Sequence, residues 1–103
     1  MKPSKRDVLS IVAERHGLSV KRMNGNRRLA PIAHARQMAM LVLRETRADS
    51  FPSIGRTVNR DHTTAMFGVK ATRKRLADDP DCARRFAECL AACRCPVLVR
   101  RVQ

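Results

Sequence analysis

The sequence predicts an all-α fold: a compact helical domain with a helix-turn-helix and an extra C-terminal helix. Apolar residues recur at helical spacing in successive segments, and most of these segments follow a residue that caps helices. No pair of segments shows the alternating pattern of paired β-strands. The 103 residues suit one domain. We expect the helix-turn-helix domain over residues 1–79 and the additional helix and tail over residues 80–103.

The first expected helix begins after Ser4. Asp7 follows this serine three residues later, which is typical of a helix start, and an apolar stripe then continues until just before Gly17. Ser19 is a second capping residue, and it predicts a short helical turn that runs to Met23.

A basic loop is expected next, because Asn24, Gly25 and Asn26 interrupt regular structure. This interruption places Arg27 and Arg28 in the loop.

Two further helices are expected in the middle of the chain. Pro31 suits the first turn of a helix, and apolar residues at helical spacing continue from it to Arg47. Residues 50–52, Ser-Phe-Pro, again combine a cap with an early proline, and residues 54–58 leave room for only a short helix. Asn59 follows, and asparagine tolerates the left-handed conformation of a tight turn.

A longer helix should begin after the N-cap Asp61 and last to about Ala77. At 100° per residue, one face of this helix is expected to pack against the core and the opposite face to be exposed. The packing face contains Ala65, Val69, Thr72 and Leu76, and the opposite face contains Thr63, Met66, Phe67, Lys70 and Lys74. Residue type, in contrast, assigns Met38, Met40 and Phe67 to core or partly buried packing.

The last expected helix has an apolar stripe before Pro96 that consists of Cys82, Phe86, Cys89, Leu90 and Cys93. The spacing of Cys89, Cys93 and Cys95 lacks the paired C-x2-C pattern of structural zinc sites. We therefore expect buried, reduced thiols rather than a metal site or disulfides.

The charge of the chain indicates a polyanionic partner. There are 22 Lys and Arg against 9 Asp and Glu, which gives a formal charge of +13, spread along the sequence rather than gathered in one arm. With no Trp or Tyr and 3 Phe, the chain is poor in the aromatic rings that stack unpaired bases, so duplex DNA is favoured over single strands. No apolar run predicts a membrane span or a secretory signal, and we expect a cytoplasmic, nucleoid-associated protein.

The short helix, the asparagine turn and the longer helix together form the pattern of a helix-turn-helix, with the helix after Asp61 as the recognition element. His62, Thr63 and Thr64 offer hydrogen-bonding groups and methyl groups in its first turn, where base edges are normally reached. Asp61 has two interpretations of equal weight: a pure N-cap, or an acceptor for a cytosine amino group. Given the overall charge, Lys70 and Lys74 are expected to contact phosphates.

Several blocks of the sequence resemble, in order, the C-terminal DNA-binding domain of the bacterial chromosomal replication initiator DnaA. Residues 60–64, RDHTT, look like the signature of that family. Residues 35–40 (ARQMAM) resemble its ARQxAM helix start, residues 50–55 (SFPSIG) its S-x-P-x-I-G segment, and Arg27 with Arg28 its basic loop. The similarity covers roughly residues 7 to 77.

The resemblance implies roles for individual residues. The loop arginine Arg28 would enter the minor groove, and the side chains of residues 61–63 would meet bases. Thr64, Arg36 and Gln37 would help to hold the DNA backbone. An arginine on a loop also suits, on physical grounds, a narrow A·T-rich minor groove with enhanced negative potential. The candidate DNA-binding residues are Arg27, Arg28, Arg36, Gln37, Arg60, Asp61, His62, Thr63, Thr64, Lys70 and Lys74.

Two features depart from the family pattern. The turn before Asp61 is one residue shorter than the family's and contains no glycine, which bears on the docking angle. Ala65 replaces a larger aliphatic residue, and Gly68 lies inside the helix at a cost of about 1 kcal/mol relative to alanine. We expect the core side of this helix to pack more closely than usual.

The sequence therefore predicts sequence-specific binding of double-stranded DNA at a DnaA-box-like site, in replication-initiation control or transcriptional regulation. The alternative is a basic protein-interaction or dimerisation module with only non-specific DNA affinity. No phosphate loop or catalytic motif is present, so we expect no enzyme activity, cofactor or small-molecule substrate. A monomer or weak dimer is expected, with an initiator or another protein as a further candidate partner.

Overall fold

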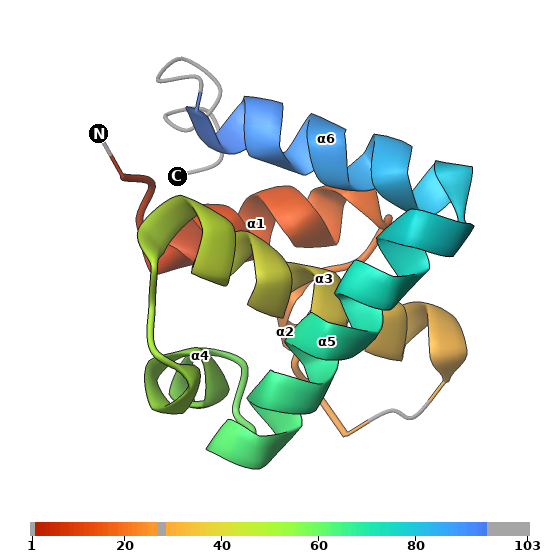
Figure 1. The fold of residues 1–103 in the computed structure, drawn as a ribbon. Coiled ribbons are helices and arrows are strands. Elements are labelled where there is room, and N and C mark those ends of the chain that lie inside the picture. Colours follow the sequence, from red (N-terminus) through yellow and green to blue (C-terminus); the bar gives the residue numbers. More distant parts are fainter. Residues whose placement is uncertain (1, 27–28, 95–103) are drawn as a thin grey trace.

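The computed structural model describes residues 2–26 and 29–94, and this part of the chain is all-helical, as predicted (Figure 1). Its elements are α1 (Lys5–Arg15), α2 (Val20–Met23), α3 (Ala30–Arg47), α4 (Phe51–Thr57), α5 (His62–Asp78) and α6 (Pro80–Arg94). No strand occurs among the described residues. No helix among them is both long and apolar enough to cross a membrane.

The helix starts follow the predicted caps. In each case a side-chain oxygen accepts a hydrogen bond from the backbone N–H three residues later, which satisfies a donor that the helix itself leaves free. The capping residues are Ser4, Ser19, Ser50 and Asp61. Helix α3 instead begins after Leu29 without a side-chain cap and has a proline in its first turn.

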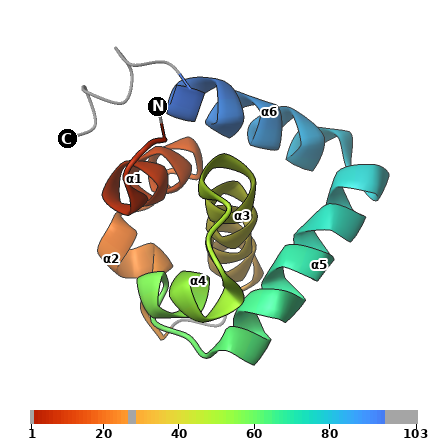
Figure 2. The same cartoon turned by 60° about the vertical axis from the view of Figure 1, so that its left-hand side comes forward.

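Helix α3 forms the centre of the molecule. In Figure 2 it is surrounded by α1, α4, α5 and α6, and it packs most extensively on α5 and α1. Its run from Met38 to Leu43 is buried throughout. Met38 and Met40 are thus core residues, as the sequence predicts.

Helix α6 lies against α1 and follows α5 after a sharp change of direction (Figure 1). Cys89, Ala92 and Cys93 are buried in the same core cluster as residues of α1 and α3, while Cys82 is half-buried. These three cysteines are free thiols. Burial raises the pKa of Cys89 to about 12 and that of Cys93 to about 11, so both remain protonated and behave as small apolar residues. Cys95 lies outside the described residues.

Gly68 explains how closely α5 approaches α3. A Cβ atom at this position would overlap the sulfur of the buried Met40 on α3. The glycine that weakens the helix therefore allows the two helices to pack at short range. This close packing, which the sequence predicts, fixes α5 against the body of the domain.

Candidate DNA-binding surface

The turn between α4 and α5 is closed without a glycine of its own. Asn59 has a positive φ of 59°, as predicted, and supplies the left-handed conformation that glycine would otherwise provide. The N–H of Arg60 donates to the carbonyl oxygen of Gly55 at 2.7 Å. A Cβ atom at Gly55 would lie 2.6 Å from the carbonyl oxygen of Arg60, so this position requires glycine for the turn to pack on α4. The shorter turn thus still holds α5 against α4.

Asp61 is the N-cap of α5, a role that both of its interpretations allow. Its Oδ1 accepts a hydrogen bond of 2.7 Å from the N–H of Thr64. This hydrogen bond is the main cause of the lowered pKa of the Asp61 carboxyl group. The side chain is exposed to solvent, and a contact between it and cytosine stays a prediction.

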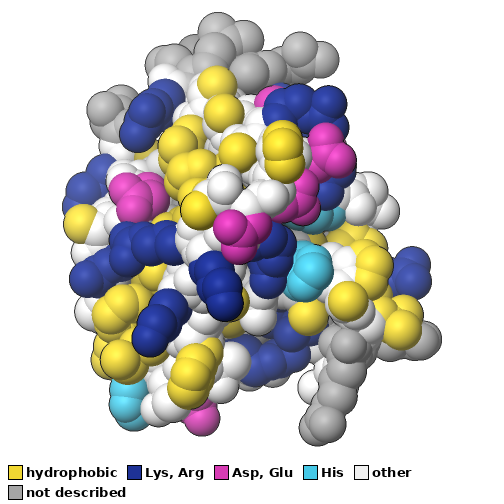
Figure 3. All heavy atoms as spheres, turned by 45° about the vertical axis from the view of Figure 1, so that its right-hand side comes forward, with side chains coloured by type: hydrophobic (Ala, Val, Ile, Leu, Met, Phe, Trp, Pro, Cys, Tyr) yellow, Lys and Arg dark blue, Asp and Glu magenta, His cyan; other side chains and the backbone are white. Residues whose placement is uncertain are grey.

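The two predicted faces of α5 are present. Ala65, Val69 and Thr72 are buried, and Leu76 is half-buried. The opposite face is exposed and contains Thr63, Met66, Phe67, Lys70 and Lys74, and His62 and Thr64 are exposed beside it. In Figure 3, Lys and Arg side chains lie over the face of the molecule on which α5 comes forward. Polar first-turn side chains and basic side chains therefore share one exposed surface.

Phe67 corrects the sequence-based prediction from residue type. It is 67% exposed rather than core or partly buried, because its position on α5 turns it away from α3. Together with Phe51, Met66 and Val69 it lines an open hollow of about 520 Å³ along the flank of α5. The helical spacing, which placed Phe67 on the exposed face, was the better guide.

Arg36 and Arg60 come together at the end of α2. Nε of the buried Arg36 donates to the carbonyl oxygen of Met23 at 2.9 Å, and Nη2 of Arg60 donates to that of Gly25 at 2.7 Å. Arg36 also donates to Gly25, at 3.3 Å. Burial and the nearby charge of Arg60 lower the pKa of Arg36. Both arginines thus tie α2 to α3 and to the turn before α5, while their contacts with DNA stay predictions.

Gln37 lies on α3 opposite the second half of α5. Its Oε1 accepts a hydrogen bond of 2.8 Å from Nη2 of Arg75 on α5, a residue that is not among the candidates predicted from the sequence. Because arginine can only donate, this bond leaves the amide N–H groups of Gln37 as the donors for other partners. The exposed pair Arg73 and Glu45, at 3.0 Å, links the same two helices.

The predicted loop arginines Arg27 and Arg28 lie outside the described residues. The structure describes the chain up to Asn26 and again from Leu29, and both of these residues are exposed. Among the described residues there is no group of three or more His, Cys, Asp or Glu side chains that could hold a metal ion.

Comparison with known proteins gives the family. Residues 6–71 match the family described as the bacterial DnaA protein helix-turn-helix. The chromosomal replication initiator protein DnaA of Neisseria meningitidis serogroup C is 34% identical over 84 residues, which cover 81% of this chain and 16% of the initiator. The corresponding protein of Cereibacter sphaeroides is 40% identical over 84 residues, covering 75% of this chain and 18% of the initiator. The chain thus spans less than a fifth of the length of these relatives, and it belongs to the bacterial DnaA helix-turn-helix family of DNA-binding domains.

Proposed function

We propose that this chain binds double-stranded DNA sequence-specifically at a DnaA-box-like site, with α5 in the major groove and the loop arginine Arg28 in the minor groove. Its role would lie in replication-initiation control or in transcriptional regulation. The observation that carries the proposal is the exposed first turn of α5, with His62, Thr63 and Thr64, on a turn that is fixed by Gly55.

Base recognition requires that the side chains that contact bases are held in a defined place. A wrong base is rejected only if its donors and acceptors do not meet those of the side chains. The hydrogen bond from Arg60 to Gly55 and the cap at Asp61 fix the start of α5. The close contact at Gly68 fixes its middle. A rigid helix with an exposed polar end supports direct reading of base edges by this turn.

Lys70 and Lys74 extend the exposed face beyond the first turn. Both are cations on long flexible side chains, which suits contacts with phosphates more than contacts with individual bases. The amide of Gln37 has its N–H groups available toward an acceptor, because Arg75 occupies its oxygen. We assign base selection to residues 61–63 and Arg28, and phosphate binding to Thr64, Arg36, Gln37, Lys70 and Lys74.

Fluorescence anisotropy tests the proposal. A labelled duplex with a TTATCCACA-type box, as the family resemblance implies, is compared with a scrambled duplex of equal composition at several salt concentrations. We expect a preference of about a thousandfold for the box, as is usual for specific DNA-binding proteins. Equal affinities for the two duplexes, followed by no enrichment from a random-sequence duplex pool, would leave a non-specific basic protein and refute the proposal.

A further inference from the structure

Phe67 is the most exposed of the large apolar side chains among the described residues. The chain has 3 phenylalanines, and the other two, Phe51 and Phe86, pack partly against the core. The guanidinium of Arg44 also covers the ring of Phe51, at 4.5 Å from its centroid. Only the ring of Phe67 is left facing solvent at 67% exposure.

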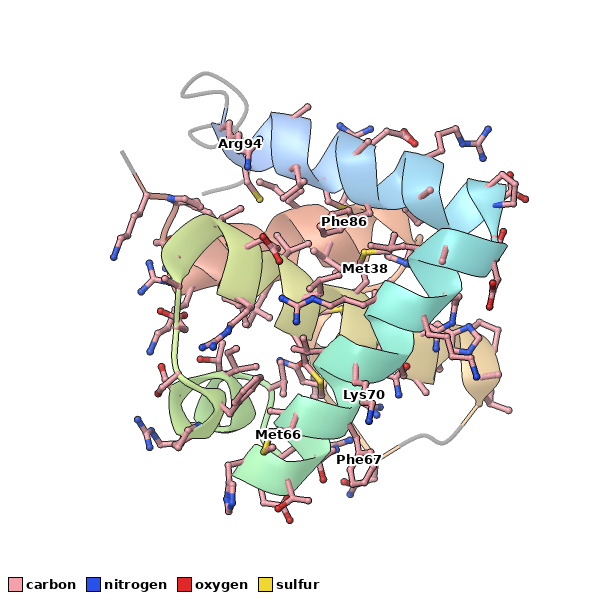
Figure 4. The ribbon with its side chains drawn as sticks, in the orientation of Figure 1. Met38, Met66, Phe67, Lys70, Phe86 and Arg94 are labelled. Atoms are coloured by element: carbon pink, nitrogen blue, oxygen red, sulfur yellow. The ribbon has the colours of Figure 1, made fainter. Side chains whose placement is uncertain are left out.

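The position of Phe67 places this ring on the candidate DNA-binding face. It follows Thr63 by one helical turn, which puts the two side chains about 40° apart around the helix axis. Figure 4 shows Phe67 and Lys70 projecting from α5 away from the core. Phe67 therefore has a polar base-reading candidate on one side and a basic residue on the other.

The chemistry of a phenyl ring limits what it can contact in DNA. The ring has no hydrogen-bond donor or acceptor of the kind that reads base edges. In the major groove the bases are distinguished by hydrogen-bonding groups and by one bulky apolar group, the C5-methyl group of thymine. An apolar ring that is presented to this groove between polar side chains thus selects thymine over the other bases.

On the basis of the function proposed above, we propose that Phe67 is a specificity-determining residue that packs against the methyl group of a thymine in the binding site. Phe67 lies about 6 Å further along the helix axis than Thr63. Successive bases of a strand are about 3.4 Å apart, so the thymine lies within about two base pairs of the position that Thr63 contacts.

A methyl-deletion scan tests this inference. Each thymine of the preferred duplex is replaced in turn by deoxyuridine, which keeps base pairing and lacks only the methyl group. For the unaltered protein we expect replacement of one thymine to weaken binding about fourfold, because the ring of Phe67 then loses contact with one buried methyl group. Phe67→Ala should bind the unmodified duplex at least fourfold more weakly and show no further loss when that thymine is replaced.

Two control variants separate this contact from general effects. Phe67→Leu keeps an apolar group at the position, so it should keep the sensitivity to the same deoxyuridine. Met66→Ala removes another exposed apolar side chain from α5, 48% exposed, and should leave that sensitivity unchanged. Because Phe67 is exposed, thermal unfolding of Phe67→Ala should match that of the unaltered protein.

The outcomes distinguish this inference from the proposed function. If the unaltered protein prefers the box but Phe67→Ala remains equally sensitive at every thymine, the role of Phe67 is refuted and the proposed function stands. The same holds if no deoxyuridine weakens binding by the unaltered protein. If the unaltered protein has no sequence preference at all, both the proposed function and the role of Phe67 fail.

Discussion

The first half of α5 differs from the layer formed by α1, α3 and α6 in how many of its residues are buried. In the layer, the helices bury long stretches, such as Val8 to Ala13 in α1 apart from Ser10 and Met38 to Leu43 in α3. In the first half of α5, Ala65, Gly68 and Val69 are buried and the other side chains face solvent. This difference indicates two roles within one small domain: the layer provides the buried core, and the start of α5 provides the exposed surface that we propose binds DNA. Substitutions in the two regions should therefore change different measured quantities.

The largest effect is expected in the layer. Leu41 of α3 is 1% exposed, and Leu41→Ala should lower the free energy of unfolding by about 2–5 kcal/mol, because it removes buried contacts and leaves a cavity. Urea denaturation measures this loss. Thr63→Ala, at an exposed position of α5, is the matched control and should unfold like the unaltered protein. A similar loss of unfolding free energy in both variants would show that the two regions do not differ in their contribution to stability.

The next effect is expected in DNA affinity. Thr63→Ala should weaken binding to the preferred duplex by about 1–3 kcal/mol and leave binding to random duplex almost unchanged. His62→Ala should behave in the same way. Both are measured by anisotropy with the two duplexes side by side. Equal losses on both duplexes would show that these side chains do not read bases.

Asp61 contributes to both roles, because its carboxylate caps α5 at the edge of the candidate DNA-binding face. Asp61→Ala should lower the thermal unfolding midpoint by a few degrees. Asp61→Asn can still accept the hydrogen bond from Thr64, so its midpoint should stay close to that of the unaltered protein. The folded state lowers the pKa of Asp61, so its contribution is present above the ordinary pKa and is lost as the pH falls through the lowered value.

Calorimetry at neutral and acidic pH checks this prediction. The difference between the unaltered protein and Asp61→Ala should shrink as the pH is lowered. A difference that stays constant at every pH would show that the cap depends on the side chain's shape rather than on its charge.

A smaller effect is expected at Lys74, on the same face of α5 but about three turns beyond Thr64, whose N–H donates to the Asp61 cap. Lys74→Ala should weaken binding to every duplex by a similar factor and reduce the slope of log K against log salt by about 1. Anisotropy at a series of salt concentrations gives this slope. An unchanged slope would show that Lys74 does not contact a phosphate.

The smallest effect concerns His16 at the end of α1, where burial lowers its pKa. The unfolded chain then takes up a proton more readily than the folded one, so stability should fall slightly as the pH drops below about 6.5. Thermal unfolding between pH 7.5 and 5.5 should show a weaker decrease for His16→Gln. The lowered pKa of His34 acts in the same direction and should leave part of the decrease in place.

Local features of the fold could be predicted from the sequence, because caps and apolar spacing act within a few residues. Ser4, Ser19, Ser50 and Asp61 begin helices as expected, and Asn59 has its left-handed conformation. These features depend on backbone groups that each helix or turn must satisfy within itself.

Contacts between distant segments could not be predicted in this way. The hydrogen bond from Arg60 to Gly25 joins residues that are 35 positions apart in the sequence, and the bond from Arg75 to Gln37 joins residues that are 38 positions apart. No local sequence pattern predicts such contacts. Residue type also misled at Phe67, where the geometry of α5 outweighs the general preference of apolar residues for the core.

Chemical-shift mapping by NMR tests the central distinction between the two regions most directly. Unlabelled duplex with the preferred site is added to nitrogen-15-labelled protein, and the shift of each backbone amide is followed. We predict the largest changes at residues 61–64 and further changes at residues 67–74, while the amides of α6 stay in place. Large changes in α6 with little change at the start of α5 would contradict the assignment of α5 as the DNA-reading helix.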